Sequence, residues 1–247
     1  MQQRNKPFTA RSVLASALLG MDPPELPVAQ LVRLTGLFGI GANRARVALS
    51  RMVVAGEVTT DGSGSYRLSG HLQERQARQS ASRSGATAPY SGQWWLAVVV
   101  TKGSTADIRT ARRRALAHAR MAELREGVWM RPANVELRLP VDLSVDVELL
   151  STRPEVPERL AANLWDLAAW AERAEDLLDA MGVLSPDTAS ALAPGFELSA
   201  SVLRHLQADP LLPEELLPSG WPGVRLRTDY DRWDVRYRTT LRNWSRA

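Results

Sequence analysis

The chain has 247 residues, a formal net charge of +4 and no cysteine. This length allows two or three small domains. The lack of cysteine excludes a disulfide framework, a thiolate nucleophile and a Cys-based metal site. No apolar run approaches the ~20 residues of a membrane span, and the polar N-terminus does not read as a signal peptide. We therefore expect a cytoplasmic protein.

The charge is unevenly distributed along the chain. Residues 1–90 hold 11 Lys and Arg against 5 Asp and Glu, and residues 91–140 hold 9 against 4. Residues 141–247 reverse the balance, with 11 against 18. This polarity is typical of a protein whose N-terminal part faces a polyanion while its acidic C-terminal part has another task.

The segment 27–68 predicts two helices joined by a tight turn and followed by a β-hairpin. Thr9 can cap an earlier helix, which Gly20 ends. The second helix of the pair, about Ala42 to Ala55, repeats its apolar residues at helical spacing. These residues are Ala45, Ala48, Leu49, Met52 and Val53. A strand at Val58–Thr60 and a glycine-rich tip then predict a wing, so residues 1–74 are interpreted as a winged helix-turn-helix domain.

The same residues allow two alternatives to this interpretation. An amphipathic helix taken alone is more often a plain surface helix, and only the whole pattern favours DNA binding. Gly39-Ile40-Gly41 could begin a dinucleotide-binding loop, but Arg44 stands where a third small residue is needed, and the preceding segment is not strand-like. We reject the second alternative.

Residues 75–90 are polar and are interpreted as a linker. A middle domain, 91–153, follows, with an apolar strand at Trp94–Val100 and a helix at Ala106–Leu124. Further strands are expected at Gly127–Met130, ended by Pro132, and at Val145–Leu150. This order suggests a small ferredoxin-like α/β sandwich.

Residues 154–247 are interpreted as a helical C-terminal domain. One long helix is expected from about Glu155 to Gly182, and another around Leu198–Leu206. A Pro-rich loop, Asp209–Gly223, leads to a final helix that holds Tyr230 and Trp233. The fold class is therefore a multidomain α+β protein.

Several motifs together resemble the PaaX-type repressors of phenylacetate catabolism. They include Phe38-Gly39-Ile40, Ser50-Arg51-Met52, Tyr66-Arg67-Leu68, Trp95, Gly127-Val128-Trp129-Met130-Arg131-Pro132, Trp165-Asp166-Leu167, the run from Asp209 to Pro218 and Trp221-Pro222-Gly223. The resemblance covers about residues 10 to 240. It implies a winged-helix domain, a Cas2-like ferredoxin-fold middle domain and a helical C-terminal domain. It also implies a dimeric repressor that a small effector, an aryl-acyl-CoA in the best-known case, releases from its operator.

Enzyme function is weighed against this expectation. A Cas2-like nuclease would need a metal-binding carboxylate at the end of the first middle-domain strand, where Thr101-Lys102-Gly103 stands, and Asp107 comes too late. His71, His118 and His205 are scattered and lack metal-ligand spacing, and there is no phosphate-binding Gly-Lys-Ser/Thr loop. We expect neither an enzyme nor a metal site. An architectural DNA-binding protein without an effector is the alternative from another class.

The outer face of the 42–55 helix supplies the expected DNA contacts. Asn43, Val47, Ser50 and Arg51 are the candidates for base edges. Arg44, Arg46 and Arg67 of the wing are the candidates for phosphates. One winged helix makes few contacts, so we expect a homodimer on an inverted-repeat operator of double-stranded DNA.

The effector is expected to be apolar with negative charge. The acidic C-terminal region is rich in aromatic residues, which allows a pocket between the helical and middle domains. Arginines would hold the anionic part of such a ligand. The candidates are Arg112, Arg113, Arg131 and Arg204.

Overall fold

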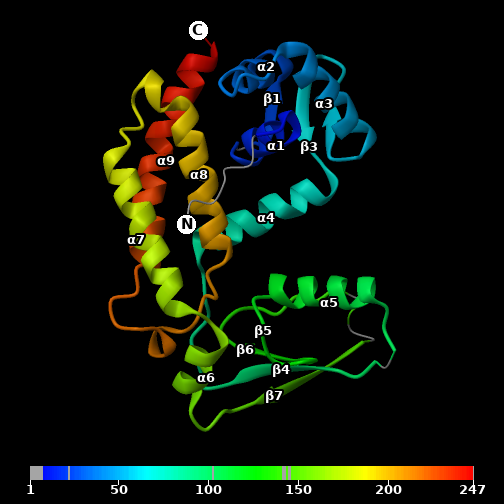
Figure 1. Ribbon diagram of the computed structural model, residues 1–247, viewed down its shortest axis with the longest axis vertical. Helices are drawn as coiled ribbons and strands as arrows, with labels where there is room; N and C mark the ends of the chain where they lie inside the picture. Colours follow the sequence, from blue (N-terminus) through cyan, green and yellow to red (C-terminus); the bar gives the residue numbers. More distant parts are fainter. Residues whose placement is uncertain (1–7, 22, 102, 141–142, 144–145, 247) are drawn as a thin grey trace. The chain divides into compact units, whose positions relative to one another are not determined.

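The computed structural model describes residues 8–21, 23–101, 103–140, 143 and 146–246. It contains helices together with two small sheets, which confirms the mixed α+β class (Figure 1). The chain packs as two compact units. The terminal unit comprises Met1–Ser84, Asp176–Gln207 and Arg225–Ala247, and the central unit comprises Gly85–Glu175 and Ala208–Val224. The segment 154–247, expected as one helical domain, is thus shared between the two units.

The terminal unit combines the N-terminal helices and a three-stranded antiparallel sheet with C-terminal helices. Its sheet has the order β1-β3-β2. Its elements are α1 Ala10–Leu19, β1 Glu25–Pro27, α2 Val28–Gly36, α3 Ala42–Val54, β2 Val58–Thr60, β3 Ser65–Leu68, α4 Gly70–Ser84, the end of α7 Leu167–Val183, η2 Ala189–Ala191, α8 Leu192–Gln207 and most of α9 Gly223–Arg246. Residues 75–84, expected as linker, are helical and belong to α4.

The first three helices share a core that the apolar periodicity largely predicted. The Thr9 side chain caps α1 and forms a capping box with Ser12. On α3 the buried residues are Ala45, Leu49 and Met52. Two residues expected on the same face are less buried: Ala48 is partly exposed and Val53 is 36% exposed.

Aromatic residues of α9 bind this helix to α7 and α8. Trp233 and Tyr237 stack with ring centroids 5.1 Å apart. The indole of Trp233 donates to the Leu184 carbonyl at 3.0 Å, and the Tyr237 hydroxyl donates to the Leu192 carbonyl at 2.8 Å. Since both polar tips have partners, the rings can be buried at little cost.

The central unit is built on a four-stranded antiparallel sheet of order β5-β6-β4-β7. Its elements are β4 Trp94–Val99, α5 Ala106–His118, β5 Ala122–Arg125, β6 Val128–Pro132, β7 Val147–Thr152, α6 Pro157–Leu164, the start of α7 and η3 Glu214–Leu216. Trp94 and Met130 pack with residues of α6, α7 and η3, whereas Ala97 and Trp129 pack with Leu116 of α5. Strand β4 is therefore covered on both faces.

Two expected helices have different bounds. The helix expected to reach Leu124 ends at His118, and Arg120 then takes a positive φ of 59° before β5 begins. The long helix expected over 155–182 is two helices, because Trp165 is extended (φ −128°, ψ 136°) and Asp166 accepts a bond from the Ala169 amide. Helical spacing of Leu160, Leu164 and Leu167 continues across this break and conceals it.

The alanine spacing of α5 does not mark its buried face, because Ile108 is 47% exposed and Ala111 is exposed. The buried residues are Arg112 and Leu116 instead. Small alanines say little about which side of a helix is buried, because they gain little from burial.

The Pro-rich loop is held by a buried polar cluster. Arg131, 1% exposed, donates to the carbonyls of Pro132 and Ala119 and to the Asn134 side chain. Asn134 in turn donates to the Leu211 carbonyl at 2.9 Å. Burial, together with the charge of Arg120, lowers the pKa of Arg131 to about 10. The loop that carries the longest family motif is thus fixed to β6 from inside.

Gly195 of α8 provides a test of how tightly α9 packs. A Cβ atom there would lie 2.5 Å from the Tyr237 ring and 3.3 Å from Trp233. We expect Gly195→Ala to lower the free energy of unfolding by about 1–3 kcal/mol, measured by urea denaturation.

The matched control is Gly182→Ala in α7, where a Cβ atom meets nothing within 4 Å. That variant is expected to be neutral or more stable by up to about 1 kcal/mol. Equal effects at the two positions would contradict the close packing of α8 on α9.

Candidate nucleic-acid interface

The turn between α2 and α3 fixes the direction of α3. Gly39 has a φ of +69°, a conformation that glycine adopts without strain. The Ile40 amide donates back to the Thr35 carbonyl at 3.2 Å, and the Ile40 side chain is buried. The turn is therefore short and anchored, and it presents α3 with one face toward solvent.

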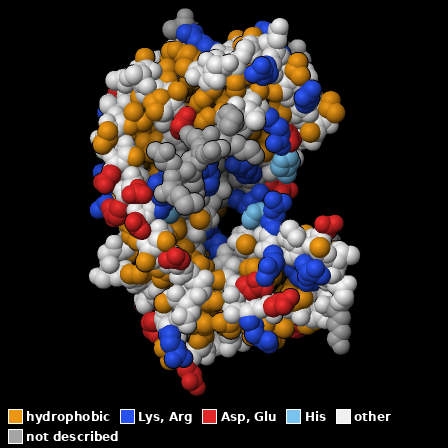
Figure 2. Space-filling view, viewed as in Figure 1, with side chains coloured by type: hydrophobic (Ala, Val, Ile, Leu, Met, Phe, Trp, Pro, Cys, Tyr) orange, Lys and Arg blue, Asp and Glu red, His pale blue; other side chains and the backbone are white. Residues whose placement is uncertain are grey.

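The solvent face of α3 is the one that the sequence predicted. Every candidate on it is exposed: Asn43, Arg44, Arg46, Val47, Ser50 and Arg51. Val47, the apolar member of this set, is 51% exposed. Among the described residues, none forms a hydrogen bond or ion pair with the three arginines. Figure 2 shows Lys and Arg side chains over this part of the molecule.

The hairpin behind α3 has an ordered tip. The Asp61 carboxylate accepts bonds from the amides of Ser63 at 2.9 Å and Ser65 at 3.2 Å. Its bonds with Ser63 hold the pKa of Asp61 below the usual value. Arg67 lies on β3 opposite Glu25, and the two form an ion pair at 2.5 Å. Its side chain is 62% exposed, so a phosphate would compete with Glu25 for this guanidinium.

An ion pair joins α1 to the turn between α3 and β2. The side chain of Glu57 is only 6% exposed, and it accepts two bonds from the Arg11 guanidinium, one of them at 2.8 Å to Nε. The hydrogen bonding from Arg11 lowers the pKa of Glu57 against the effect of burial. Arg11 is therefore held by the protein rather than free to contact a phosphate.

Aromatic contacts connect α2 and the α2–α3 turn with the C-terminal helices of the same unit. The ring of Phe38, in the α2–α3 turn, lies 5.3 Å from the ring of Phe196 on α8 in an edge-on arrangement. The guanidinium of Arg33 on α2 lies 4.6 Å from the ring centroid of Trp244 on α9. Each contact couples an element that positions α3 to one that comes late in the sequence.

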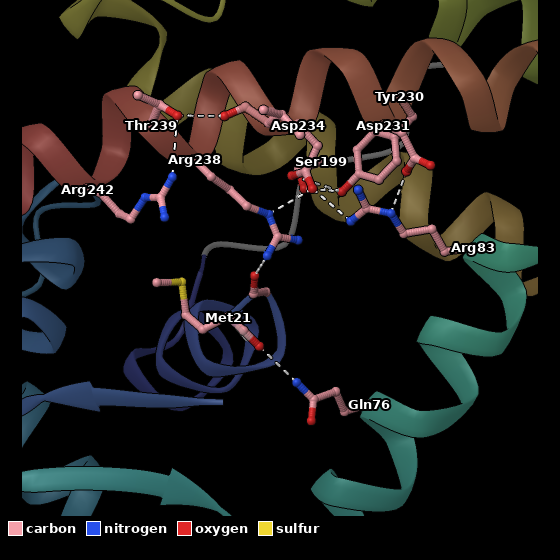
Figure 3. A network of polar contacts seen from close by, with 12 residues as sticks. Met21, Gln76, Arg83, Ser199, Tyr230, Asp231, Asp234, Arg238, Thr239 and Arg242 are labelled. Atoms are coloured by element: carbon pink, nitrogen blue, oxygen red, sulfur yellow. Dashed lines mark hydrogen bonds and ion pairs between the residues drawn. The ribbon is translucent and has the colours of Figure 1, made fainter. Parts of the chain in front are cut away.

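A buried carboxylate on α9 also connects the N-terminal and C-terminal helices, through ion pairs. Asp234 of α9 is 2% exposed and accepts bonds from Arg83 of α4 and Arg238 of α9, both at 2.7 Å. Arg238 also donates to the Gly20 carbonyl at the end of α1. In Figure 3 the two arginines approach Asp234 from different sides, and Tyr230 lies beside it. Burial and the charge of Asp234 raise the pKa of Tyr230.

The four arginines expected at an effector site fall into different places. Arg112 and Arg113 of α5 line one cavity of the central unit, with Arg112 3.6 Å from Asp146 and Arg113 2.5 Å from Glu123. Arg131 is buried behind the Pro-rich loop. Arg204 belongs to the terminal unit and lines a cavity there with Arg75, a residue that was not among the predicted site residues.

Asp146 is a second residue that the sequence did not single out. It lies beside the end of β4, where its carboxylate accepts a bond from Thr101 at 2.7 Å and approaches Arg112. Within the described part of the chain, no three His, Cys, Asp or Glu residues gather as a metal site would require. None of the described helices is long and apolar enough to cross a membrane.

Comparison with known proteins assigns the family. The model of the PaaX-like protein matches residues 9–72, and that of the PaaX-like protein C-terminal domain matches residues 165–244. The solved structure of uncharacterized protein Rv0674 from Mycobacterium tuberculosis has 40% sequence identity to this chain and a TM-score of 0.76. The match covers 97% of this chain and 99% of that one. Curated proteins give no significant match.

The chain therefore belongs to the PaaX-like family, as its motifs indicated. Membership of this family associates it with the regulation of transcription.

The Arg11–Glu57 pair gives a prediction with a pH signature. We expect Arg11→Ala to lower the free energy of unfolding by about 1–2 kcal/mol at pH 7, because a buried carboxylate loses its partner. The pKa of Glu57 is lowered in the folded state, so the pair stabilises the protein above the ordinary value of 4.5. The deficit of the variant should shrink as the pH falls below that value.

Denaturant titrations at pH 7 and pH 3.5 measure this difference. Arg159→Ala, which changes an exposed residue of α6, is the control and should show no deficit at either pH. A deficit for Arg11→Ala that is the same at both pH values would contradict the role of the Glu57 charge.

Proposed function

We propose that the protein is a sequence-specific DNA-binding repressor of transcription whose reading element is α3. One observation carries this proposal: six exposed polar, basic or apolar side chains share the solvent face of a helix that is anchored on its other face. A major groove accepts a helix of this kind. Membership of the PaaX-like family supports the same conclusion.

We assign the N-terminal region to the winged helix-turn-helix class. Supporting this, α2 and α3 are joined by a tight turn, and the β2–β3 hairpin follows α3 directly. We assign the central sheet to the ferredoxin-like class. Numbered within this unit, its four strands have the order 2-3-1-4 and are all antiparallel, and α5 connects the first two. That order is the one a ferredoxin-like sheet has.

The α3 side chains divide into two proposed roles. Asn43, Val47, Ser50 and Arg51 contact base edges, where an arginine pairs with guanine and a valine meets a thymine methyl group. Arg44, Arg46 and Arg67 hold phosphates. Arg67 does so by exchanging the Glu25 carboxylate for the DNA backbone, since its own side chain is 62% exposed and solvent weakens the pair.

Arg51→Ala separates base reading from phosphate binding. It should cost about 1–3 kcal/mol on the preferred sequence and relax the preference at one base pair. Arg44→Ala should weaken all sequences alike and reduce the slope of log affinity against log salt by about 1. Fluorescence anisotropy over a salt series measures both effects, with Arg159→Ala as the control.

Unchanged affinity and sequence preference in Arg51→Ala would remove this residue from the base-reading set. A loss that is uniform over all sequences would make Arg51 a phosphate contact instead.

We further propose that the protein acts as a homodimer on an inverted repeat. One α3 covers a single half-site, and two half-sites about one helical turn apart, or a multiple of it, supply the affinity that specific binding requires. Multi-angle light scattering of the free protein and of its complex with DNA should give a mass of two chains. A single chain in both samples would contradict the dimer.

The effector class proposed from the family resemblance is an aryl-acyl-CoA or a related aromatic catabolite. An architectural protein without an effector is the second candidate, favoured by the ion pairs that already engage Arg112 and Arg113. We propose no catalytic role. Asp146, a carboxylate beside the end of β4, is engaged by Thr101 and Arg112.

A further inference from the structure

The terminal unit contains a cavity between four helices. Helices α1 and α4 come from the N-terminal region and helices α8 and α9 from the C-terminal region, so the cavity lies where the two regions meet. Its empty volume is about 760 Å³, including the part that opens to solvent. An apolar wall is formed by Ala17, Leu19, Phe196, Leu203, Tyr237 and Leu241.

The cavity has an excess of positive charge. Arg75 of α4 and Arg204 of α8 both line it and are exposed on its rim. Within the described part of the chain, neither forms a hydrogen bond or an ion pair. Partial burial lowers the pKa of Arg75, and the charges of Arg204, Arg78 and Arg11 lower it further. This guanidinium therefore stands among other cations.

The acidic residue of the cavity wall cannot neutralise these arginines. Asp234 already accepts bonds from Arg83 and Arg238, and Tyr230 approaches it at 3.4 Å. Two guanidiniums that have no acidic partner among the described residues, placed beside an apolar wall, are suited to a ligand that brings both an acidic group and an apolar body.

We propose that this cavity binds a small organic anion, with its apolar body against Phe196 and Leu203 and its acidic group held by Arg75 and Arg204. The site differs from the one expected between the middle and helical domains, because all its residues belong to the terminal unit.

The cavity is connected to the elements that position α3. Phe196 forms part of its wall and also contacts Phe38 in the α2–α3 turn. Arg238 lines it and donates to the Gly20 carbonyl at the end of α1. A ligand that moves either side chain therefore changes a contact that holds α3 in place. This consequence rests on the proposed DNA-binding function, whereas ligand binding itself does not.

The test uses two probes that differ by one sulfonate group. The anion 8-anilino-1-naphthalenesulfonate and the neutral N-phenyl-1-naphthylamine share one apolar skeleton. Fluorescence titration of the full chain should show saturable binding of the anion, one molecule per chain. The double variant Arg75→Gln/Arg204→Gln should bind the anion about tenfold or more weakly, whereas its affinity for the neutral probe should change little.

Two further variants keep the test selective. Ala200→Phe narrows the cavity and should weaken the binding of both probes. A thermal unfolding temperature close to that of the wild type shows that this variant is folded. Arg159→Gln, in the central unit, should change neither. Equal binding of the anion to the wild type and to the double variant, or binding that does not saturate, would overturn the proposal.

A second arm measures DNA affinity with and without a saturating concentration of the anionic probe. A change of about fivefold or more that is lost in the double variant supports the link to α3. No change overturns that link. If the protein binds no DNA, the proposed function fails, and the probe titration still decides whether the cavity is an anion site.

Discussion

The buried carboxylate of Asp234 is the constraint on which the terminal unit depends. A charge that is 2% exposed must be compensated inside the protein, and Arg83 of α4 and Arg238 of α9 do so. Because Arg238 also donates to the carbonyl that ends α1, one carboxylate fixes three helices. Removing it would leave two guanidiniums beside each other at the junction of the N-terminal and C-terminal segments.

This junction explains why the last helices belong to the same compact unit as the proposed DNA-reading helix. The sequence suggested an acidic C-terminal domain that is separate from the basic N-terminal region. In the structure, α8 contacts the α2–α3 turn through Phe196, and α9 reaches α2 through Trp244. A change in the packing of α8 or α9 can therefore alter the placement of α3 without a long path between separate domains.

Local signals were enough to predict the N-terminal elements. Each signal lies within a few neighbouring residues: the apolar spacing of α3, the Thr9 cap and the glycine-rich hairpin. The exposed face of α3 follows from its apolar spacing. Long-range partners were not predictable. Arg67 pairs with Glu25 from a segment 42 residues away, and Arg75 lies near Arg204 from a segment still further away. The burial of Arg131 depends on tertiary packing. The break at Trp165 was concealed by a continuous apolar period.

Sequence reading by the exposed face of α3 is the central proposal. Its most direct measurement is selection of bound fragments from a random DNA pool by the full chain, followed by sequencing. We expect enrichment of one motif with two inverted half-sites, and no enrichment when Asn43, Val47 and Arg51 are all replaced by alanine. The same motif from the triple variant, or no motif from the wild type, would contradict it.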